Sequence, residues 1–142
     1  DITKDVNGYL SMFRSKPSAM LALILGNSNE IKEKGRIISE YTDKEIEKLL
    51  EIPPLTVRVG EYVVPAYNIT VHTSICGDTL AGRQDKTVVL FTIKGEQVKL
   101  SFRSKEHHEP SSLELATLLG AGGHKNASGV SVPLEQFLKM LQ

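Results

Sequence analysis

A pair of prolines, Pro53-Pro54, divides the sequence into two parts with different hydrophobic periods. Upstream, apolar residues recur every three to four positions, as in Ile46–Leu50, which is the spacing of a helix that buries one face. Downstream, apolar and polar residues alternate over Leu55–Val59, which is the spacing of a half-buried strand. Because proline cannot continue a helix, we predict a helical segment over residues 1–52 and a separate domain over residues 53–142.

Three helices are expected upstream of the proline pair. The first covers Pro17–Leu25 and is closed by Gly26, and the second runs from Asn29 to about Ile38. The third begins at Thr42, where the glutamate three residues later completes a capping box, and it ends before Pro53.

Downstream of the prolines, the sequence predicts an α/β domain on a mixed sheet of about five strands with flanking helices. The strands are Leu55–Val59, Tyr62–Ile69, Thr87–Lys94, Gln97–Arg103 and Ser128–Val132, and helices begin near Ser74, Ser111 and Pro133. Gly95-Glu96 predicts a hairpin turn, and Ser111 with Glu114 forms a second capping box. Pro65 has no N–H for a sheet ladder, which favours an edge strand or a bulge. The apolar run Val88–Phe91 is typical of a central strand covered on both faces.

The charge balance narrows the function. The chain has 17 basic and 17 acidic residues, and a general nucleic-acid coat would need an excess of lysine and arginine. Local recognition of a phosphate group stays open, because it requires only a few donors. Cys76 is the single cysteine, which excludes an internal disulfide, and the longest apolar run, Ala19–Leu25, is too short to span a bilayer. We expect a cytoplasmic protein, because no signal peptide opens the chain, and Asp1 at its start indicates part of a longer protein.

The segment with the clearest chemistry is the glycine-rich stretch Gly120–Gly129. Glycine allows positive φ and close approach of a ligand to the backbone, and successive backbone N–H groups in such a turn form a concave anion site. His124 adds a titratable donor, Lys125 a positive charge, and Asn126 a side chain that both donates and accepts. The alternative is a tight connection between a helix and a strand, with His124 as a structural hydrogen bonder.

Two motifs carry a resemblance to a known family. The string Gly-Ala-Gly-Gly-His-Lys-Asn-Ala-Ser-Gly over Gly120–Gly129 resembles the Gly-Gly-Gly-His-x-x-Ala-Ala-Gly signature of the domain associated with Asp-His-His (DHH) phosphoesterases. Lys-Leu-Ser-Phe-Arg-Ser over Lys99–Ser104 resembles the strand ending in Ser-x-Arg-Ser that precedes this loop in the same family. The resemblance covers roughly residues 55–142, and the glycine–histidine string is its specific part.

The resemblance implies a division of labour between two domains. In this family the N-terminal domain holds two metal ions, usually manganese, whose bound water attacks phosphorus, and the DHH-associated domain grips the substrate. By position, the substrate-binding residues here are Arg103, Ser104, Gly122, Gly123, His124, Lys125 and Asn126. Arg103 suits a bidentate grip on phosphate oxygens, and Ser104 adds a hydroxyl donor. His124 could stabilise developing charge and is the nearest to a catalytic residue, and no metal is expected in this chain.

The match departs from the family pattern at two positions. Ala121 stands where glycine is preferred, and Ser128 replaces the second alanine. If position 121 required a positive φ, alanine there would cost on the order of 1 kcal/mol.

Other residues have a weaker case for function. Glu106–Glu109 (Glu-His-His-Glu) gathers metal-ligating residue types, but adjacent side chains in an extended chain point to opposite sides, so a solvated loop is the preferred interpretation. Tyr62 and Tyr67 lie on a predicted strand, where packing is favoured over stacking on a base. Packing is also the default interpretation for His72 and Cys76.

The leading hypothesis is a phosphate- or nucleotide-binding domain of a metal-dependent DHH phosphoesterase, with residues 1–52 as the linker from the catalytic domain. Its partners would be a short oligonucleotide, a nucleotide or polyphosphate, together with the N-terminal DHH domain of the same protein, and no membrane. Two alternatives stay open: a stand-alone module that binds single-stranded nucleic acid without catalysis, and a degenerate domain kept for homodimer or other partner contacts.

Overall fold

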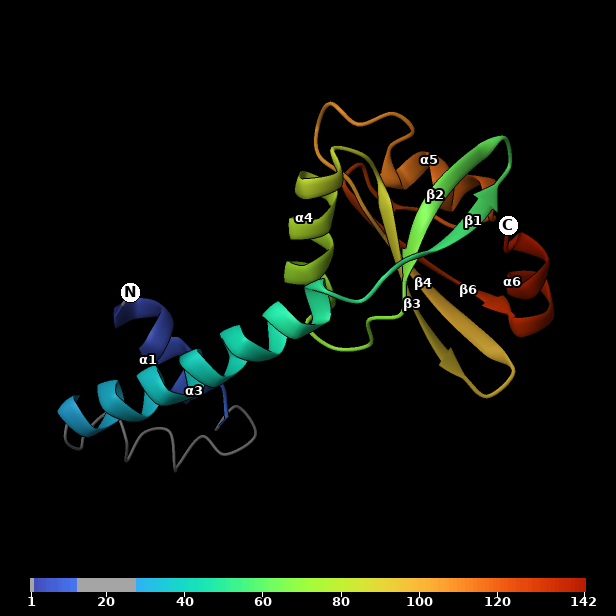
Figure 1. Ribbon diagram of the computed structural model, residues 1–142. Helices are drawn as coiled ribbons and strands as arrows, with labels where there is room; N and C mark the ends of the chain where they lie inside the picture. The colour runs from blue at the N-terminus through green and yellow to red at the C-terminus, as the bar shows by residue number, and fades with distance from the viewer. Residues whose placement is uncertain (1, 13–27) are drawn as a thin grey trace. The chain divides into compact units, whose positions relative to one another are not determined.

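The computed structural model describes residues 2–12 and 28–142, and the chain falls into two compact units, Asp1–Lys48 and Leu49–Gln142. The described part of the first unit is helical, and the second unit carries a sheet (Figure 1). The helix expected over Pro17–Leu25 lies outside the described residues.

Unit 1 contains helix α1 (Ile2–Ser11) and almost all of helix α3 (Ser28–Leu50). The two helices approach closely at Gly35, where an added Cβ would lie 2.0 Å from the carbonyl oxygen of Asp5. On α3, Ile31, Gly35 and Ser39 are buried at intervals of four residues, so they form one face of the helix. The absence of a side chain at Gly35 therefore allows the backbone of α1 to pack against α3.

Helix α3 shows that the predicted break before Thr42 is wrong. Thr42 lies inside the helix and does not cap a new one. No glycine or proline interrupts residues 36–50, and Arg36 forms ion pairs with Glu33 and Glu40 on the exposed surface. Pairs at these spacings stabilise a continuous helix and outweigh the local capping signal.

Unit 2 is built on a six-stranded mixed sheet in the order β1-β2-β3-β4-β6-β5. The strands are β1 (Leu55–Val59), β2 (Tyr62–Tyr67), β3 (Val88–Lys94), β4 (Gln97–Arg103), β5 (Gly123–His124) and β6 (Ala127–Pro133). The helices are α4 (Thr73–Gln84), α5 (Ser112–Leu118) and α6 (Leu134–Met140). β2 and β3 are parallel and connected through α4, and the other neighbouring strands are antiparallel. The predicted α/β class with a mixed sheet is confirmed, with one strand more than the five expected.

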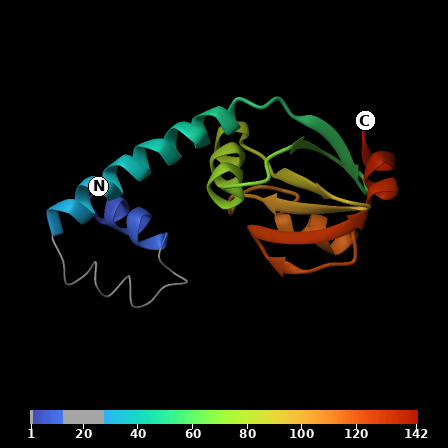
Figure 2. The same ribbon diagram turned by 90° about the horizontal axis from the view of Figure 1, so that it is seen from below.

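The hydrophobic core lies between the sheet and helices α5 and α6, and α4 lies on the other side of the sheet (Figures 1 and 2). From β4 the core receives Val98, Leu100 and Phe102, and from the helices it receives Leu115 and Phe137. Because side chains alternate along a strand, the intervening polar residues of β4 point to the α4 face.

Helix α4 covers only part of its face of the sheet. Its Gly77 lies against the sheet, since an added Cβ would be 3.3 Å from the side chain of Leu90. Along β3, residues Val88–Phe91 are buried, Thr92 is half-buried, and Lys94 is exposed. The part of the sheet that α4 covers therefore ends near Thr92, and the remainder of this face carries polar side chains.

Several local predictions can be compared with the structure. The β3–β4 hairpin with Gly95 at its turn (φ 60°) is confirmed, and so is the capping box of α5 at Ser111. Ser74 does not cap α4, because the helix begins at Thr73 after His72, which adopts a left-handed conformation. The additional strand, β5, lies in the segment that was expected to be an irregular glycine-rich loop.

Pro65 lies on an inner strand and in unbroken register with β1, so the prediction of an edge strand or a bulge is wrong. β2 pairs with β3 only at Ala66 and Tyr67, and the residues before them pair on one side only, with β1. Pro65 therefore removes no hydrogen bond from the β2–β3 ladder, which explains why it is tolerated.

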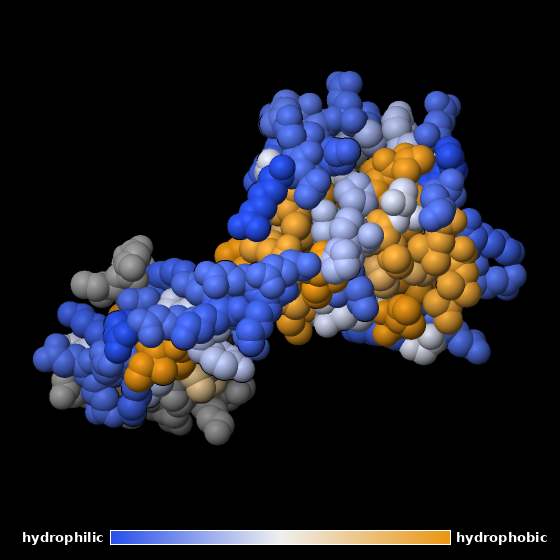
Figure 3. Space-filling view, viewed as in Figure 1, coloured by the Kyte–Doolittle hydropathy of each residue, from blue (hydrophilic) through white to orange (hydrophobic). Residues whose placement is uncertain are grey.

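Unit 2 also exposes apolar side chains on its surface. In the space-filling view, hydrophobic residues gather over the sheet and α6 (Figure 3). Exposed large hydrophobic residues of these elements include Leu55, Val63, Ile93 and Leu138. Among the helices of the described residues, none is long and apolar enough to cross a bilayer.

Replacing Ser111 with alanine should lower the free energy of unfolding of unit 2 by about 1 kcal/mol, because the N-cap oxygen is lost. In the structure the Ser111 hydroxyl accepts from the backbone N–H of Glu114, and the Glu114 carboxylate accepts from that of Ser111. Urea unfolding followed at the β4 amide resonances measures the effect. Ser111→Asp is the control, because aspartate also caps; equal losses in both variants would contradict the capping role.

Candidate functional site

The predicted site residues meet where β4, β6 and β5 lie side by side. Arg103 of β4 lies opposite Ala127 of β6, and His124 of β5 lies opposite the same alanine. Directly paired residues point to the same face of a sheet, so Arg103 and His124 flank Ala127 on the α4 face. Two strand spacings separate their Cα atoms, which is about 10 Å. The short side chain of Ala127 leaves room between them.

Helix α4 positions the side chain of Arg103. One guanidinium nitrogen donates to the Ser74 hydroxyl at 3.0 Å, and another lies 3.8 Å from the Asp78 carboxylate. Gly77 makes this position available, because an added Cβ would lie 2.4 Å from Cγ of Arg103. The arginine side chain is 23% exposed. Its remaining N–H donors can therefore reach a ligand on the α4 face.

Ser104 fastens the turn between β5 and β6 from inside the domain. It is only 3% exposed, and its backbone N–H donates to the carbonyl oxygen of Asn126 at 3.1 Å. Its hydroxyl lies 3.3 Å from the carbonyl oxygen of Lys125 and accepts from the backbone N–H of Ser112 at 3.1 Å. Because these contacts use the hydroxyl internally, Ser104 positions the turn, and the predicted role as a donor to phosphate does not fit its geometry.

The glycines of the turn differ in what they require. Gly123 has a φ of 151°, and an added Cβ would lie 2.6 Å from Cβ of Ser128 on the neighbouring strand. Gly122 has open space where its Cβ would be, and it is exposed. Close pairing of β5 with β6 therefore requires glycine at position 123 and not at position 122.

The two departures from the family pattern both fit the fold. Positive φ among the described non-glycine residues is confined to His72 and Asp85, so Ala121 carries no such strain. The Ala121 N–H donates to the carbonyl oxygen of Ala116 at 2.9 Å and closes α5. The hydroxyl of Ser128 donates to the carbonyl oxygen of Ser112 at 2.6 Å, so it also anchors β6 to α5.

On the outer side of the turn, Glu106 binds the side-chain donors of the turn. Its carboxylate pairs with the Lys125 ammonium group and accepts from the Asn126 side-chain amide at 3.0 Å. These contacts hold the pKa of Glu106 below its ordinary value, with the hydrogen bond from Lys125 as the largest cause. The imidazole of His124 is exposed and, within the described residues, has no hydrogen-bond partner in the protein. Lys125 and Asn126 thus already hold an anionic group, while His124 is free to meet one.

A second polar cluster joins Asp85, at the end of α4, to the predicted loop over Glu106–Glu109. Oδ1 of Asp85 lies 2.8 Å from Nε2 of His107 and 3.2 Å from Nε2 of His108. The two histidines lower the pKa of Asp85, and the hydrogen bond from His107 contributes most. The solvated loop expected here is correct for His107 and wrong for His108, which is buried. Sequence analysis missed Asp85, because it is more than twenty positions from either histidine.

The hydrogen bonds of His108 do not suit a metal ligand. Its Nδ1 accepts the backbone N–H of Lys105 at 2.9 Å, so the proton of the neutral ring is on Nε2. That proton serves the bond to Asp85, whereas a metal would require an unprotonated Nε2. The geometry therefore favours a structural link between α4 and the loop after β4.

The tyrosines considered for base stacking differ in exposure. Tyr67 is only 2% exposed, and burial raises the pKa of its hydroxyl, so packing is confirmed there. Tyr62 is 39% exposed and lies near Leu118 and Leu113. Cys76 is buried, and burial raises the pKa of its thiol, which confirms packing for this residue as well.

Comparison with known proteins brings no family assignment, because no protein-family model matches the chain and no curated protein matches it significantly.

Gly123→Ala should destabilise the β5–β6 pair by about 1–3 kcal/mol, because the new Cβ meets the backbone of β6. Gly122→Ala is the matched control and should fold like the parent chain. Hydrogen exchange of the β6 amides measures both variants. Equal protection of these amides in the two variants would show that close approach at Gly123 does not hold β5 in place.

The contact between Glu106 and the turn should be present at neutral pH and lost only below pH 4.5, the ordinary pKa of the group. A carboxyl whose pKa is lowered by folding stabilises the folded state above its unfolded pKa, and that stabilisation disappears as the pH falls through the lowered value. The side-chain amide resonance of Asn126 should report this titration, and Glu106→Gln should abolish it. A midpoint at or above 4.5 would contradict the contact.

Proposed function

We propose that this chain is the substrate-binding domain of a DHH-family phosphoesterase, and that it binds the phosphate end of a short oligonucleotide, a nucleotide or polyphosphate. The observation that carries the proposal is the position of Arg103 and His124 on either side of Ala127 on one face of the sheet. Each of the two motifs that carry the resemblance contributes one of these two residues. Two residues whose Cα atoms are about 10 Å apart, with a small residue between them, can direct their donor groups at one tetrahedral anion from two sides.

In this proposal each residue has a distinct role. Arg103 donates to phosphate oxygens from a side chain that α4 already holds in place. His124 donates to a phosphate oxygen from the opposite side and stabilises charge that develops there. Gly122 and Gly123 leave the backbone of the turn accessible, and Ser104 holds the turn.

Glu106 supports the anion-binding character of the turn. A carboxylate held by Lys125 and Asn126 has the charge and the acceptor atoms of a phosphate oxygen pair. A ligand that recruits Lys125 and Asn126 must displace this carboxylate. Glu106 therefore competes with the substrate, and its removal should strengthen binding.

The chemical step belongs, in this proposal, to an N-terminal DHH domain that supplies manganese. The chain described here would bind and orient the substrate and would show no metal-dependent hydrolysis alone. The Asp85–His107–His108 cluster does not replace the manganese site, because the tautomer of His108 does not fit a metal ligand.

The alternative of a stand-alone module for single-stranded nucleic acid has less support. Such modules combine a basic groove with exposed aromatic residues. Here the net charge is zero, and Tyr67 is buried. Binding of one phosphate end fits the few localised donors better than tracking of a long strand.

Replacing either Arg103 or His124 with alanine should weaken binding of adenosine monophosphate at least about tenfold, because hydrogen bonds to charged groups contribute about 1.5–3 kcal/mol. Glu106→Gln should strengthen it. Amide chemical-shift titration measures these affinities, and Arg83→Ala, which removes an exposed arginine elsewhere, is the control.

Two outcomes would contradict the proposal. Unchanged affinity in His124→Ala, together with a large fall in thermal stability, would make His124 structural. Manganese-dependent turnover by the purified chain would contradict the division of labour between the two domains.

A further inference from the structure

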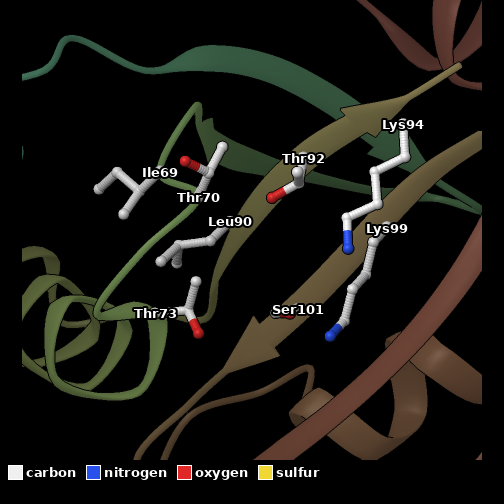
Figure 4. A pocket seen from close by; sticks show the side chains of 8 residues that line it. All are labelled: Ile69, Thr70, Thr73, Leu90, Thr92, Lys94, Lys99 and Ser101. Carbon is white, nitrogen blue, oxygen red and sulfur yellow. The ribbon is translucent and has the colours of Figure 1, made fainter. Parts of the chain in front are cut away.

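A polar pocket lies on the α4 face of the sheet, beside the site at Arg103. It is formed by β3, β4 and the segment that leads from β2 into α4 (Figure 4). The polar side chains that line it are Thr70, Thr73, Thr92, Lys94, Lys99 and Ser101. None of the lining residues is acidic. The pocket therefore has a positive charge without an internal counter-ion.

The hydroxyl groups of the pocket have unused hydrogen-bonding capacity. Thr92 and Ser101 come from β3 and β4, and Thr73 comes from the start of α4. Within the described part of the chain, none of these three hydroxyls has a hydrogen-bond partner. Elsewhere in unit 2, the hydroxyls of Thr87 and Thr117 are bonded to backbone carbonyl oxygens. The pocket thus gathers donors that the fold itself does not use.

Two lysines provide the charge. Lys99 lies opposite Thr92. Lys94 is the diagonal neighbour of Lys99 on the same face, and the Cα atoms of the two lysines are about 7–8 Å apart. Both stems run along the sheet toward the hydroxyls of Thr92 and Ser101 (Figure 4). Neither lysine is ion-paired within the described residues, whereas Lys125 is. Two like charges at this spacing repel, and an anion between them would remove the repulsion.

The size of the pocket selects a small group. Its volume is about 100 Å³. A molecule of liquid water occupies about 30 Å³, and pockets for whole drug-sized ligands have about 300–1,000 Å³. Ile69 and Leu90, both buried, complete the lining. The space accepts a phosphate group but not a nucleoside.

We propose that this pocket binds a phosphate group, either free or attached to a larger molecule, through Lys94, Lys99 and the hydroxyls of Thr92 and Ser101. It is distinct from the Arg103–His124 site. Ser101 and Arg103 are two residues apart on β4, about 7 Å, and the arginine turns toward Ser74 of α4. The proposal goes beyond the function proposed above and does not require it.

The test is an NMR titration of the whole chain with inorganic phosphate. Amide shifts should appear at Thr92, Lys99 and Ser101, and the double variant Lys94→Gln/Lys99→Gln should weaken phosphate binding at least tenfold. The control is Lys86→Gln/Lys139→Gln, which removes the same charge from exposed positions elsewhere and should bind like the parent. Repeating the titration on His124→Ala separates the two sites, because shifts in the pocket should persist there.

A 5′-phosphorylated dinucleotide distinguishes the two sources of phosphate. If the lysine variant also weakens dinucleotide binding, the pocket takes a phosphate of a larger molecule. If it weakens only the binding of inorganic phosphate, the ligand is free phosphate, and the proposal stands in either case. Absence of shifts at the pocket with inorganic phosphate and with the dinucleotide, or equal losses in the lysine variant and its control, would overturn it.

Discussion

The register between β4 and β6 is the constraint on which the candidate site depends. Val98, Leu100 and Phe102 are buried under α5 and α6, and strand alternation then sends Arg103 to the opposite face. A slip of one residue would expose Phe102, which loses about 1.5–3 kcal/mol of burial, and would bury an unpaired guanidinium group. The same register determines which residues of β6, and through β6 which residues of β5, lie beside Arg103. The position of His124 is therefore a consequence of core packing on the other side of the sheet.

A buried pair of hydroxyls then connects the sheet to the turn. The Oγ atoms of Ser104 and Ser112 lie 3.0 Å apart, and both residues are buried. A buried hydroxyl left without a partner costs about 1–3 kcal/mol. The Ser112 hydroxyl donates to that of Ser104, which in turn lies 3.3 Å from the carbonyl oxygen of Lys125 and accepts from the backbone N–H of Ser112. The turn is thus held from inside, so the outward side chain of His124 is not needed to hold it in place.

The sequence predicted best those features whose causes are local. The capping box at Ser111 and the hairpin at Gly95 each depend on residues within a few positions, and both are correct. The same type of box at Thr42 misled, because ion pairs along a longer helix outweigh it. β5 could not be predicted, because two residues show no strand period and pair only where β6 lies beside them. The burial of Ser104 depends likewise on contacts with segments some 8 and 21 positions away, which motif spacing does not reveal.

Zero net charge conceals an uneven distribution of charge on the α4 face. Near the turn, each cation has an acidic neighbour: Arg103 lies near Asp78, and Lys125 pairs with Glu106. Such internal counter-ions keep the cationic side chains in position without a ligand, and they also compete with any anion that arrives. A carboxylate carries one negative charge, whereas a phosphate monoester carries about 1.5–2 at neutral pH. Under the proposed function, exchange of Glu106 for a phosphate thus favours a dianion over singly charged anions. The acidic neighbour that weakens binding is then also a source of selectivity.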